Sequence, residues 1–252
     1  MSSDIWTQCA GRSEVRALKL TPWRVVESQH QVSTRKLVDT LDEHALLEEL
    51  IDAAKPRDIT NDRQHYLLST PFRYPPLPFG SRFGARRERG IWYGAEVIAT
   101  ALAEVAYYRL VFLEGTAAAL GRITVELTAF RVNARTAHGV DLVTEPFASH
   151  RRAIASPSGY RSSQALGAAM RGDGVEMCRF PSARDPEGGV CVAVFVPGVF
   201  GRSAPQGFQR WQCSATREGV EMVRRDFTAK ESLQFARRVF LVHGRLPMPA
   251  VE

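Results

Sequence analysis

An arginine, a tyrosine and a glutamate stand at near-equal intervals within residues 71–113 of this chain. Arg82 lies in the sequence GSRFG, Tyr93 in the sequence GIWYG and Glu104 in the sequence ATALAEV. An arginine can clamp a phosphate with two parallel hydrogen bonds, a tyrosine ring can stack on a planar base, and a half-buried carboxylate can orient a hydroxyl group. We therefore expect this stretch to form one wall of an active site that binds a dinucleotide.

Each of these three residues also has a structural alternative. An arginine between two glycines often braces a loop, and an aromatic pair ahead of a helix often packs as a hydrophobic staple. A glutamate at the margin of a helix often forms an ion pair, here with Arg109 or Arg122. The residue types by themselves leave both interpretations open.

The segments that must position these residues have clear patterns. The prolines of residues 71–78 stiffen the approach to the loop tip, which Gly80 and Gly84 flank. Because proline restricts φ, such a loop loses less entropy when it is ordered. The clearest helix pattern follows the aromatic pair, and Glu104 lies at the margin of its apolar stripe, whereas Glu96 points to solvent. The stripe consists of Val97, Ile98, Ala101, Leu102, Val105, Tyr108 and Phe112.

Further helices and strands alternate along the rest of the chain. Helical patterns cover residues 37–51, which we expect to pack on the core, and residues 162–171. We expect a polar connector at residues 57–70 and irregular structure at residues 1–22 and 131–159. Strand patterns occur at residues 23–26, 121–130, 190–196, 208–216, 220–223 and 238–242.

These patterns predict an α+β protein with a mixed β core and flanking helices. The strand at 190–196 is apolar throughout and is expected at the centre of the sheet, and the strands at 208–216 and 220–223 form a hairpin. We divide the chain into an N-terminal arm, residues 1–22, and a single domain, residues 23–252, which begins with a helical elaboration.

The composition is typical of a soluble globular protein, with 252 residues of which 44% are hydrophobic and 24% charged. There is no run of about 18 apolar residues and no signal-peptide pattern, so we expect a cytoplasmic protein without a membrane segment. The net charge is +6, but the arginines are scattered along the chain. This distribution disfavours direct nucleic-acid binding and suits an acidic partner or a phosphate-bearing ligand.

The cysteines and histidines give no sign of a metal site or a catalytic triad. Cys9, Cys178, Cys191 and Cys213 show no Cys-x-x-Cys spacing and have no histidine at zinc-finger spacing. We expect them to be buried free thiols in a reducing compartment. The six histidines are not arranged for Ser–His catalysis.

The order of several motifs resembles the RES domain, a family named for an arginine, a glutamate and a serine. The motifs are GSRFG, GIWYG and ATALAEV, followed by the helix SSQALGAAMR, the sequence FPSAR and an apolar strand. The resemblance extends roughly over residues 23–242. It implies an ADP-ribosyltransferase-like fold and a bacterial toxin that consumes NAD⁺ by phosphorolysis or hydrolysis. It also implies an Xre-like antitoxin that occludes the cleft in a hetero-oligomer.

The resemblance implies roles for individual residues. Arg82 would anchor the phosphates or ribose, Tyr93 would pack on the nicotinamide, and Glu104 and Ser182 would orient the ribose and the acceptor. Second phosphate contacts would come from Arg73 and Arg184. Many relatives have an asparagine at the start of the strand after the serine motif, where this chain has Cys191.

Cleavage of the nicotinamide–ribose bond passes through a positively charged, oxocarbenium-like centre. The protein must hold the dinucleotide, exclude water and stabilise the charge that develops on the ribose. One alternative function keeps this chemistry but transfers ADP-ribose to a cellular protein. Another is a non-enzymatic nucleic-acid-binding module, whose binding would depend on salt and not on Glu104.

Overall fold

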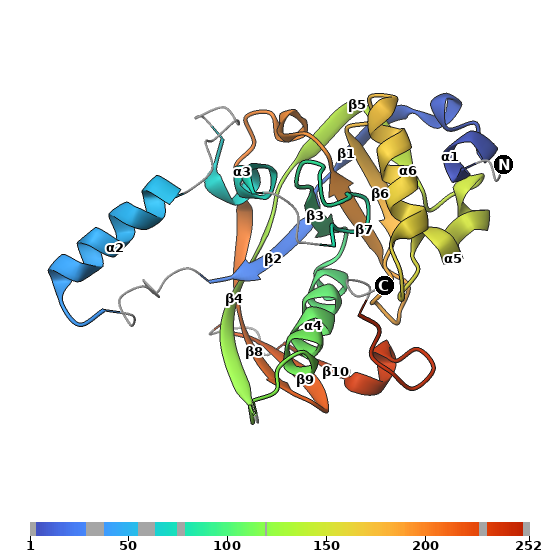
Figure 1. Cartoon of the computed structure of the whole chain (residues 1–252). Helices are drawn as coiled ribbons and strands as arrows, with labels where there is room; N and C mark the ends of the chain where they lie inside the picture. The colour runs from blue at the N-terminus through green and yellow to red at the C-terminus, as the bar shows by residue number, and fades with distance from the viewer. Residues whose placement is uncertain are drawn as a thin grey trace.

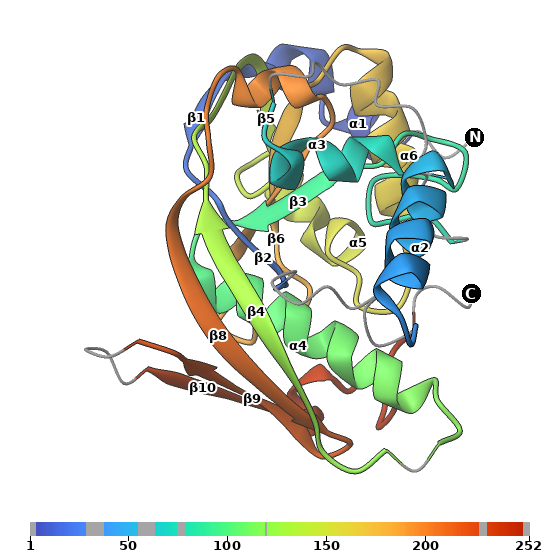
Figure 2. The same cartoon turned by 90° about the vertical axis from the view of Figure 1, so that its left-hand side faces the viewer.

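The computed structural model describes residues 4–28, 38–54, 64–74, 79–118, 120–226 and 231–248. Within these residues ten strands form one mixed sheet in the order β1-β5-β6-β7-β3-β2-β4-β8-β9-β10 (Figure 1, Figure 2). Neighbouring strands are antiparallel except β5 and β6, which are parallel. The predicted α+β class is therefore confirmed. The strands are β1 (Arg16–Leu20), β2 (Trp23–Glu27), β3 (Trp92–Ala95), β4 (Ile123–Arg131), β5 (Ala134–Asp141), β6 (Met177–Pro181), β7 (Val190–Val194), β8 (Gln206–Thr216), β9 (Gly219–Arg224) and β10 (Ser232–Ala236).

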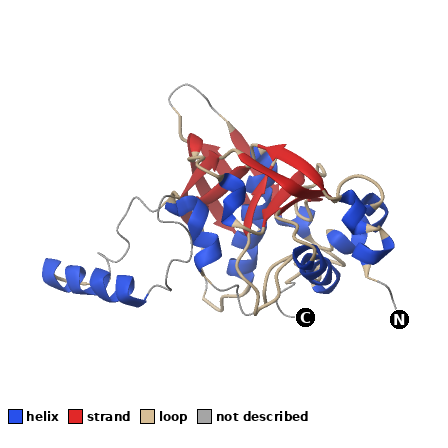
Figure 3. Cartoon of the chain, turned by 90° about the horizontal axis from the view of Figure 1, so that it is seen from above, coloured by secondary structure: helices blue, strands red, loops and turns tan. Residues whose placement is uncertain are grey.

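The helices lie on both faces of the sheet, except α2, which projects away from it (Figure 1, Figure 3). Helix α4 packs against β2, β8 and β9, α3 packs beside η4, and α1 and α5 pack against α6. In the described parts of the chain, no helix has the length and apolar character needed to span a membrane. The helices are α1 (Ile5–Gln8), η1 (Gly11–Glu14), α2 (Leu41–Ala54), α3 (Tyr66–Arg73), α4 (Ile98–Glu114), η3 (Phe147–His150), α5 (Arg151–Ile154), α6 (Arg161–Gly172), η4 (Pro197–Phe200) and η5 (Arg237–Phe240).

Strand alternation decides which side chains can meet, because successive residues point to opposite faces of the sheet. Trp92 of β3 packs with Val192 and Val194 of β7 in the cluster that α3 covers. Its neighbour Tyr93 faces the other way, toward a cluster that α1, α5 and α6 cover. A third cluster lies between α4 and strands β4, β8 and β9. The second and third clusters lie on the same face of the sheet, and Trp23 of β2 packs against both.

Helix α4 is confirmed, but the predicted buried face is rotated. Val97, Tyr108 and Phe112 of the predicted stripe are 53%, 52% and 55% exposed. The sequence of α4 is apolar almost all around, so its period does not show which side faces the sheet. Glu96, which was expected in solvent, forms an ion pair with Arg179. The buried residues of α4 are Thr100, Ala101, Leu102, Ala103, Ala106, Tyr107, Leu110 and Leu113.

The N-terminal segment is ordered from Asp4 onward, so the prediction of irregular structure there is wrong. Strand β1 pairs with β5, and Trp6 of α1 is buried. The indole Nε1 of Trp6 donates to Asp173 Oδ2 at 2.6 Å, and Arg12 pairs with the same carboxylate. These elements are only four or five residues long, which is too short for a periodic signal, and their stability comes from tertiary contacts.

Three other predictions of irregular or extended structure are wrong. Strand β5 and the helical turns η3 and α5 occupy most of residues 134–154. The polar connector ends at residue 65, because α3 begins at Tyr66 and runs through Pro71. The expected strand at 238–242 is replaced by η5, and the last strand of the sheet is β10. A polar sequence such as ARTAHGVD gives little sign of a strand, although β5 pairs with a neighbouring strand on each side.

The other strand and helix predictions are confirmed. The strands at 23–26 and 121–130 appear as β2 and β4, the apolar strand at 190–196 as the interior strand β7, and the hairpin as β8 and β9. The helix at 162–171 appears as α6, and all four cysteines are buried free thiols. The predicted helix at 37–51 appears as α2. Leu37, residues 57–63 and Pro75, Pro76 and Pro78 lie outside the described residues.

Candidate functional site

A cleft of about 300 Å³ lies on the face of the sheet that α4 and α6 cover. Arg82, Tyr93 and Glu104, which come from a loop, a strand and a helix, all line it. Ser182 is not among the lining residues, but it contacts Glu104 from behind. Clefts of this size are typical of small-molecule sites. The other lining residues are Arg24, Val25, Gly80, Ser81, Ile91, Gly94, Ala95, Ala101, Val105, Tyr108, Tyr160, Phe180 and Cys191.

Helix α6 holds the loop that carries Arg82. The side-chain Nε2 of Gln164 donates to the carbonyls of Phe79, Ser81 and Gly84 at 3.1, 3.0 and 3.3 Å. Helix and loop are in backbone contact at Gly167, since a Cβ on this residue would lie 2.1 Å from the carbonyl oxygen of Phe83. The helix therefore serves as a rigid platform for the loop.

Arg82 is buried and braces a second loop. Its Nη1 donates to the carbonyls of Ile154 and Ser156 at 3.1 and 3.0 Å. The guanidinium carbon lies 5.0 Å from the centre of the Tyr160 ring. The structural alternative for this arginine, loop bracing, is thus observed. The same side chain also lines the cleft, so its charge acts on any ligand there.

Tyr93 holds the Arg82 loop from the opposite side. It belongs to β3 and not to a staple ahead of a helix. Its hydroxyl is bonded to Ser81 Oγ at 2.9 Å and accepts the backbone N–H of Phe83 at 3.1 Å. Burial raises the pKa of Tyr93, so the phenol remains neutral at pH 7. Tyr93 also lines the cleft.

Ser182 and Cys191 orient the carboxylate of Glu104. Ser182 Oγ donates to Glu104 Oε1 at 2.6 Å, and Cys191 Sγ donates to the same oxygen at 3.6 Å. Ser182 Oγ also accepts the backbone N–H groups of Arg184 and Asp185 at 3.1 and 3.0 Å. This hydroxyl therefore has no further proton to donate. Among the described residues no hydrogen bond reaches Glu104 Oε2, which can accept one from a ligand.

Of the two ion-pair partners considered for Glu104, Arg109 pairs with Glu27 instead, and among the described residues no salt bridge joins Glu104 to Arg122. Burial and the charge of Glu104 raise the pKa of Cys191 well above its usual value, so this residue is a thiol at pH 7. The loop after Ser182 is tied to α4, where Thr100 Oγ1 donates to Asp185 Oδ2 at 2.6 Å. The site thus presents a fixed carboxylate with one oxygen available.

The two other predicted phosphate contacts do not line the cleft. Arg184 is 3% exposed, and its guanidinium lies 3.5 Å from the centre of the Tyr107 ring while Nη2 donates to the carbonyl of Pro157 at 2.8 Å. Burial raises the pKa of Tyr107 to about 12. Arg73 ends helix α3, on the opposite side of the sheet. We therefore take neither as a phosphate ligand of this cleft.

Sequence reasoning missed three cleft residues. Arg24 of β2 donates from Nη1 to the carbonyl of Tyr93 at 3.1 Å, and burial lowers its pKa to about 10. Tyr108 and Tyr160 bring their hydroxyls to 3.1 Å from each other. The sequence predicted a short strand at residues 23–26 but gave no reason to examine its arginine. The tyrosine pair joins α4 to the residue before α6, and no local pattern predicts such a contact.

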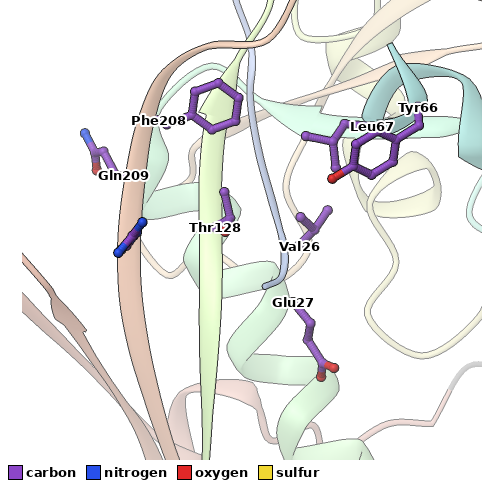
Figure 4. A pocket seen from close by; sticks show the side chains of 8 residues that line it. Val26, Glu27, Tyr66, Leu67, Thr128, Phe208 and Gln209 are labelled. Carbon is purple, nitrogen blue, oxygen red and sulfur yellow. The ribbon is translucent and has the colours of Figure 1, made fainter. Parts of the chain in front are cut away.

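A second cleft, of about 320 Å³, lies between α3 and strands β2, β4 and β8 (Figure 4). We call it the β2–α3 groove. Its one carboxylate, Glu27, pairs with Arg109, and it brings together no other acidic residue that could act with a base. The groove therefore lacks the chemistry of the first cleft. Its lining residues are Val26, Glu27, Tyr66, Leu67, Thr128, Phe208, Gln209 and Arg210.

The RES domain model matches residues 55–215, which is more than half of the chain. The chain therefore belongs to the RES-domain family. Arg82, Tyr93, Glu104 and Ser182 all lie within the matched residues, whereas Arg24 precedes them. No curated protein gave a significant match. In the described residues no group of three or more His, Cys, Asp or Glu side chains is arranged to hold a metal ion.

Proposed function

We propose that this protein is a bacterial toxin that degrades NAD⁺ at the bond between nicotinamide and ribose. RES-domain proteins are generally toxins of toxin–antitoxin systems. The observation that carries the proposal is the carboxylate of Glu104, which Ser182 orients inside a cleft that Arg82 and Tyr93 also line. We further propose that residues 23–252 form one catalytic domain of the ADP-ribosyltransferase type, working in the cytoplasm.

In the proposed reaction the C1′–N bond of the nicotinamide ribose breaks, and both bonding electrons go to the nicotinamide nitrogen. Nicotinamide leaves as a neutral molecule, and positive charge develops on the ribose. The fixed charge of Glu104 stabilises this centre. Its free Oε2 accepts a hydrogen bond from a ribose hydroxyl, which orients the sugar.

The second half of the reaction transfers the ribose to an acceptor. An oxygen of water or phosphate forms the new bond to C1′, and water, when it is the acceptor, loses a proton to the bulk solvent. Ser182 acts as a positioning residue, since its proton is already donated to Glu104. Tyr93 offers a ring face to the nicotinamide, and the charge of Arg82 attracts the phosphates.

The test is proton NMR of NAD⁺ mixed with purified, antitoxin-free protein, in buffers with and without inorganic phosphate. Nicotinamide release only in phosphate buffer identifies a phosphorylase, and release in both identifies a hydrolase. A stable ADP-ribose adduct on a cellular protein, without bulk loss of NAD⁺, would instead identify a transferase. If wild-type protein neither releases nicotinamide nor forms an adduct, the proposal is wrong.

The proposed partner is an Xre-like antitoxin protein that covers the cleft in a hetero-oligomer. A toxin of this kind must be restrained, and the basic chain, with a net charge of +6, suits an acidic inhibitor. Expression of the free protein in bacteria is expected to stop growth and lower cellular NAD⁺. Unimpaired growth with soluble, NAD⁺-cleaving protein present in the cells would contradict a toxin role.

Arg82→Lys is expected to lower NAD⁺ cleavage about 100-fold. Lysine keeps the positive charge, but it cannot donate to the carbonyls of Ile154 and Ser156 as the guanidinium does. Steady-state kinetics measures the loss, and hydrogen exchange should show faster exchange in residues 155–159. Wild-type kinetics together with faster exchange would show that the braced loop does not matter for the reaction.

A further inference from the structure

Among the described elements, no other helix or strand packs extensively against helix α2. It starts with a capping box, in which Glu43 N–H donates to Thr40 Oγ1 while Glu43 Oε2 accepts the N–H groups of Asp39 and Thr40. These bonds hold the pKa of Glu43 below its usual value. The helix projects away from the sheet (Figure 1, Figure 3). Its formation is therefore encoded locally and not by packing on the core, so the expected core packing is wrong.

The apolar side of α2 is partly exposed. Leu46 and Leu50 have exposed fractions of 56% and 58%, and Leu47 and Ile51 are half-buried. Together with Leu47 and Ile51, the leucines at 46 and 50 form a stripe at helical spacing. A helix of 14 residues is only marginally stable alone in water, and an exposed apolar stripe of this kind is typical of an interface. The stripe needs a complementary apolar surface.

The β2–α3 groove offers such a surface. Tyr66 and Phe208 are 56% and 55% exposed, although both carry large aromatic rings. Figure 4 shows Tyr66 and Leu67 on one side of the groove and Phe208 on the other, with Val26 between them. A groove flanked by exposed rings can accept the leucines of an amphipathic helix.

The charges of the two surfaces are complementary. The sequence of α2 contains five acidic residues and no lysine or arginine. Because the whole chain has a net charge of +6, the rest of the chain carries +11. The charged residues at the groove itself are Arg210 and Glu27, and the carboxylate of Glu27 is paired with Arg109. An acidic partner or an anionic lipid surface would repel α2, whereas a second copy of this basic chain attracts it.

We propose that α2 of one copy docks in the β2–α3 groove of a second copy, and the second copy returns the same contact. The chain enters α2 from β2 and leaves it toward α3, the two elements that border the groove. Reciprocal exchange of α2 would give a closed, two-fold symmetric dimer. The groove lies apart from the cleft of Glu104, so this dimer does not depend on the proposed reaction.

Two single-cysteine variants test the exchange between copies. Leu46→Cys and Phe208→Cys protein, carrying different affinity tags, are mixed and oxidised, and the four native thiols are buried and remain unreactive. A disulfide-linked dimer with both tags is expected, and it can form only between two copies. The matched control pairs Leu46→Cys with Phe112→Cys, which is equally exposed on α4 but outside the groove.

Light scattering provides the second measurement. The wild-type chain is expected at twice its 28.0 kDa mass, and Leu46→Glu/Leu50→Glu protein at 28.0 kDa with an unchanged circular dichroism spectrum. A wild-type monomer overturns the proposal. So does a cross-link that forms as readily with the Phe112→Cys control, or a double-cysteine chain (Leu46→Cys/Phe208→Cys) that closes only within one molecule.

Discussion

Glu104→Gln is expected to lower kcat/KM for NAD⁺ cleavage by at least 100-fold while the fold is retained. The glutamine carbonyl can still accept the proton of Ser182 Oγ, so the local geometry is preserved. What is lost is the negative charge beside the ribose, and removal of one such stabilising group typically costs about 10²–10³ in rate. Proton NMR of nicotinamide release measures the effect.

The control for this variant is Glu114→Gln on the same helix. Glu114 pairs with Arg237 at the surface and does not line the cleft. It should therefore leave the rate unchanged. Equal losses in both variants would mean that the charge of α4 as a whole matters, and a fully active Glu104→Gln protein would remove Glu104 from the mechanism.

Gly167→Ala is expected to destabilise the protein by about 3 kcal/mol and to abolish NAD⁺ cleavage. The new Cβ would lie 2.1 Å from the carbonyl oxygen of Phe83, and backbone cannot move aside as a flexible side chain can. Helix α6 must then shift away from the loop, and Arg82 moves with the loop. Urea unfolding measures the loss of stability, and the nicotinamide assay measures the loss of function.

Gly172→Ala, on the same helix, provides a matched comparison. A Cβ at Gly172 meets no atom within 4 Å, so alanine adds no clash. Alanine has less backbone freedom than glycine in the unfolded chain, so the substitution should stabilise the protein by about 0.5–1 kcal/mol. If Gly167→Ala behaves like Gly172→Ala, the close contact between α6 and the loop does not control the site.

Segments with a strong period were predicted well from the sequence, and short or polar segments were not. Strand β7 is apolar throughout and the β8–β9 hairpin has a glycine at its turn, so both could be recognised locally. Strand β5 is polar and α1 has four residues, so neither has a local signal. Their structure depends on β1, β6 and Asp173, which are distant in the sequence.

The candidate site shows the same division. The motifs around Arg82, Tyr93, Glu104 and Ser182 could be found in the sequence, and the RES family match includes all four. The sequence could not show that the Ser182 hydroxyl donates to Glu104 and accepts two backbone N–H groups. Its partners come from α4 and from the turn that follows Ser182. Nor could the sequence show that Arg184 is buried against the ring of Tyr107.

By itself, the sequence determined the family, the α+β class and the residue types of the site, because these depend on local pattern and residue chemistry. Tertiary structure decided which face of α4 is buried, which oxygen of Glu104 is available and where α2 lies. The first depends on packing against β2, β8 and β9, and the second on Ser182 and Cys191, which are distant from Glu104 in the sequence. For α2, no other described helix or strand packs extensively against it. Helix α4 is apolar on nearly every side, so its sequence indicates burial but not which side faces the sheet. The sequence of α2 indicates a helix with one apolar side but not what that side contacts.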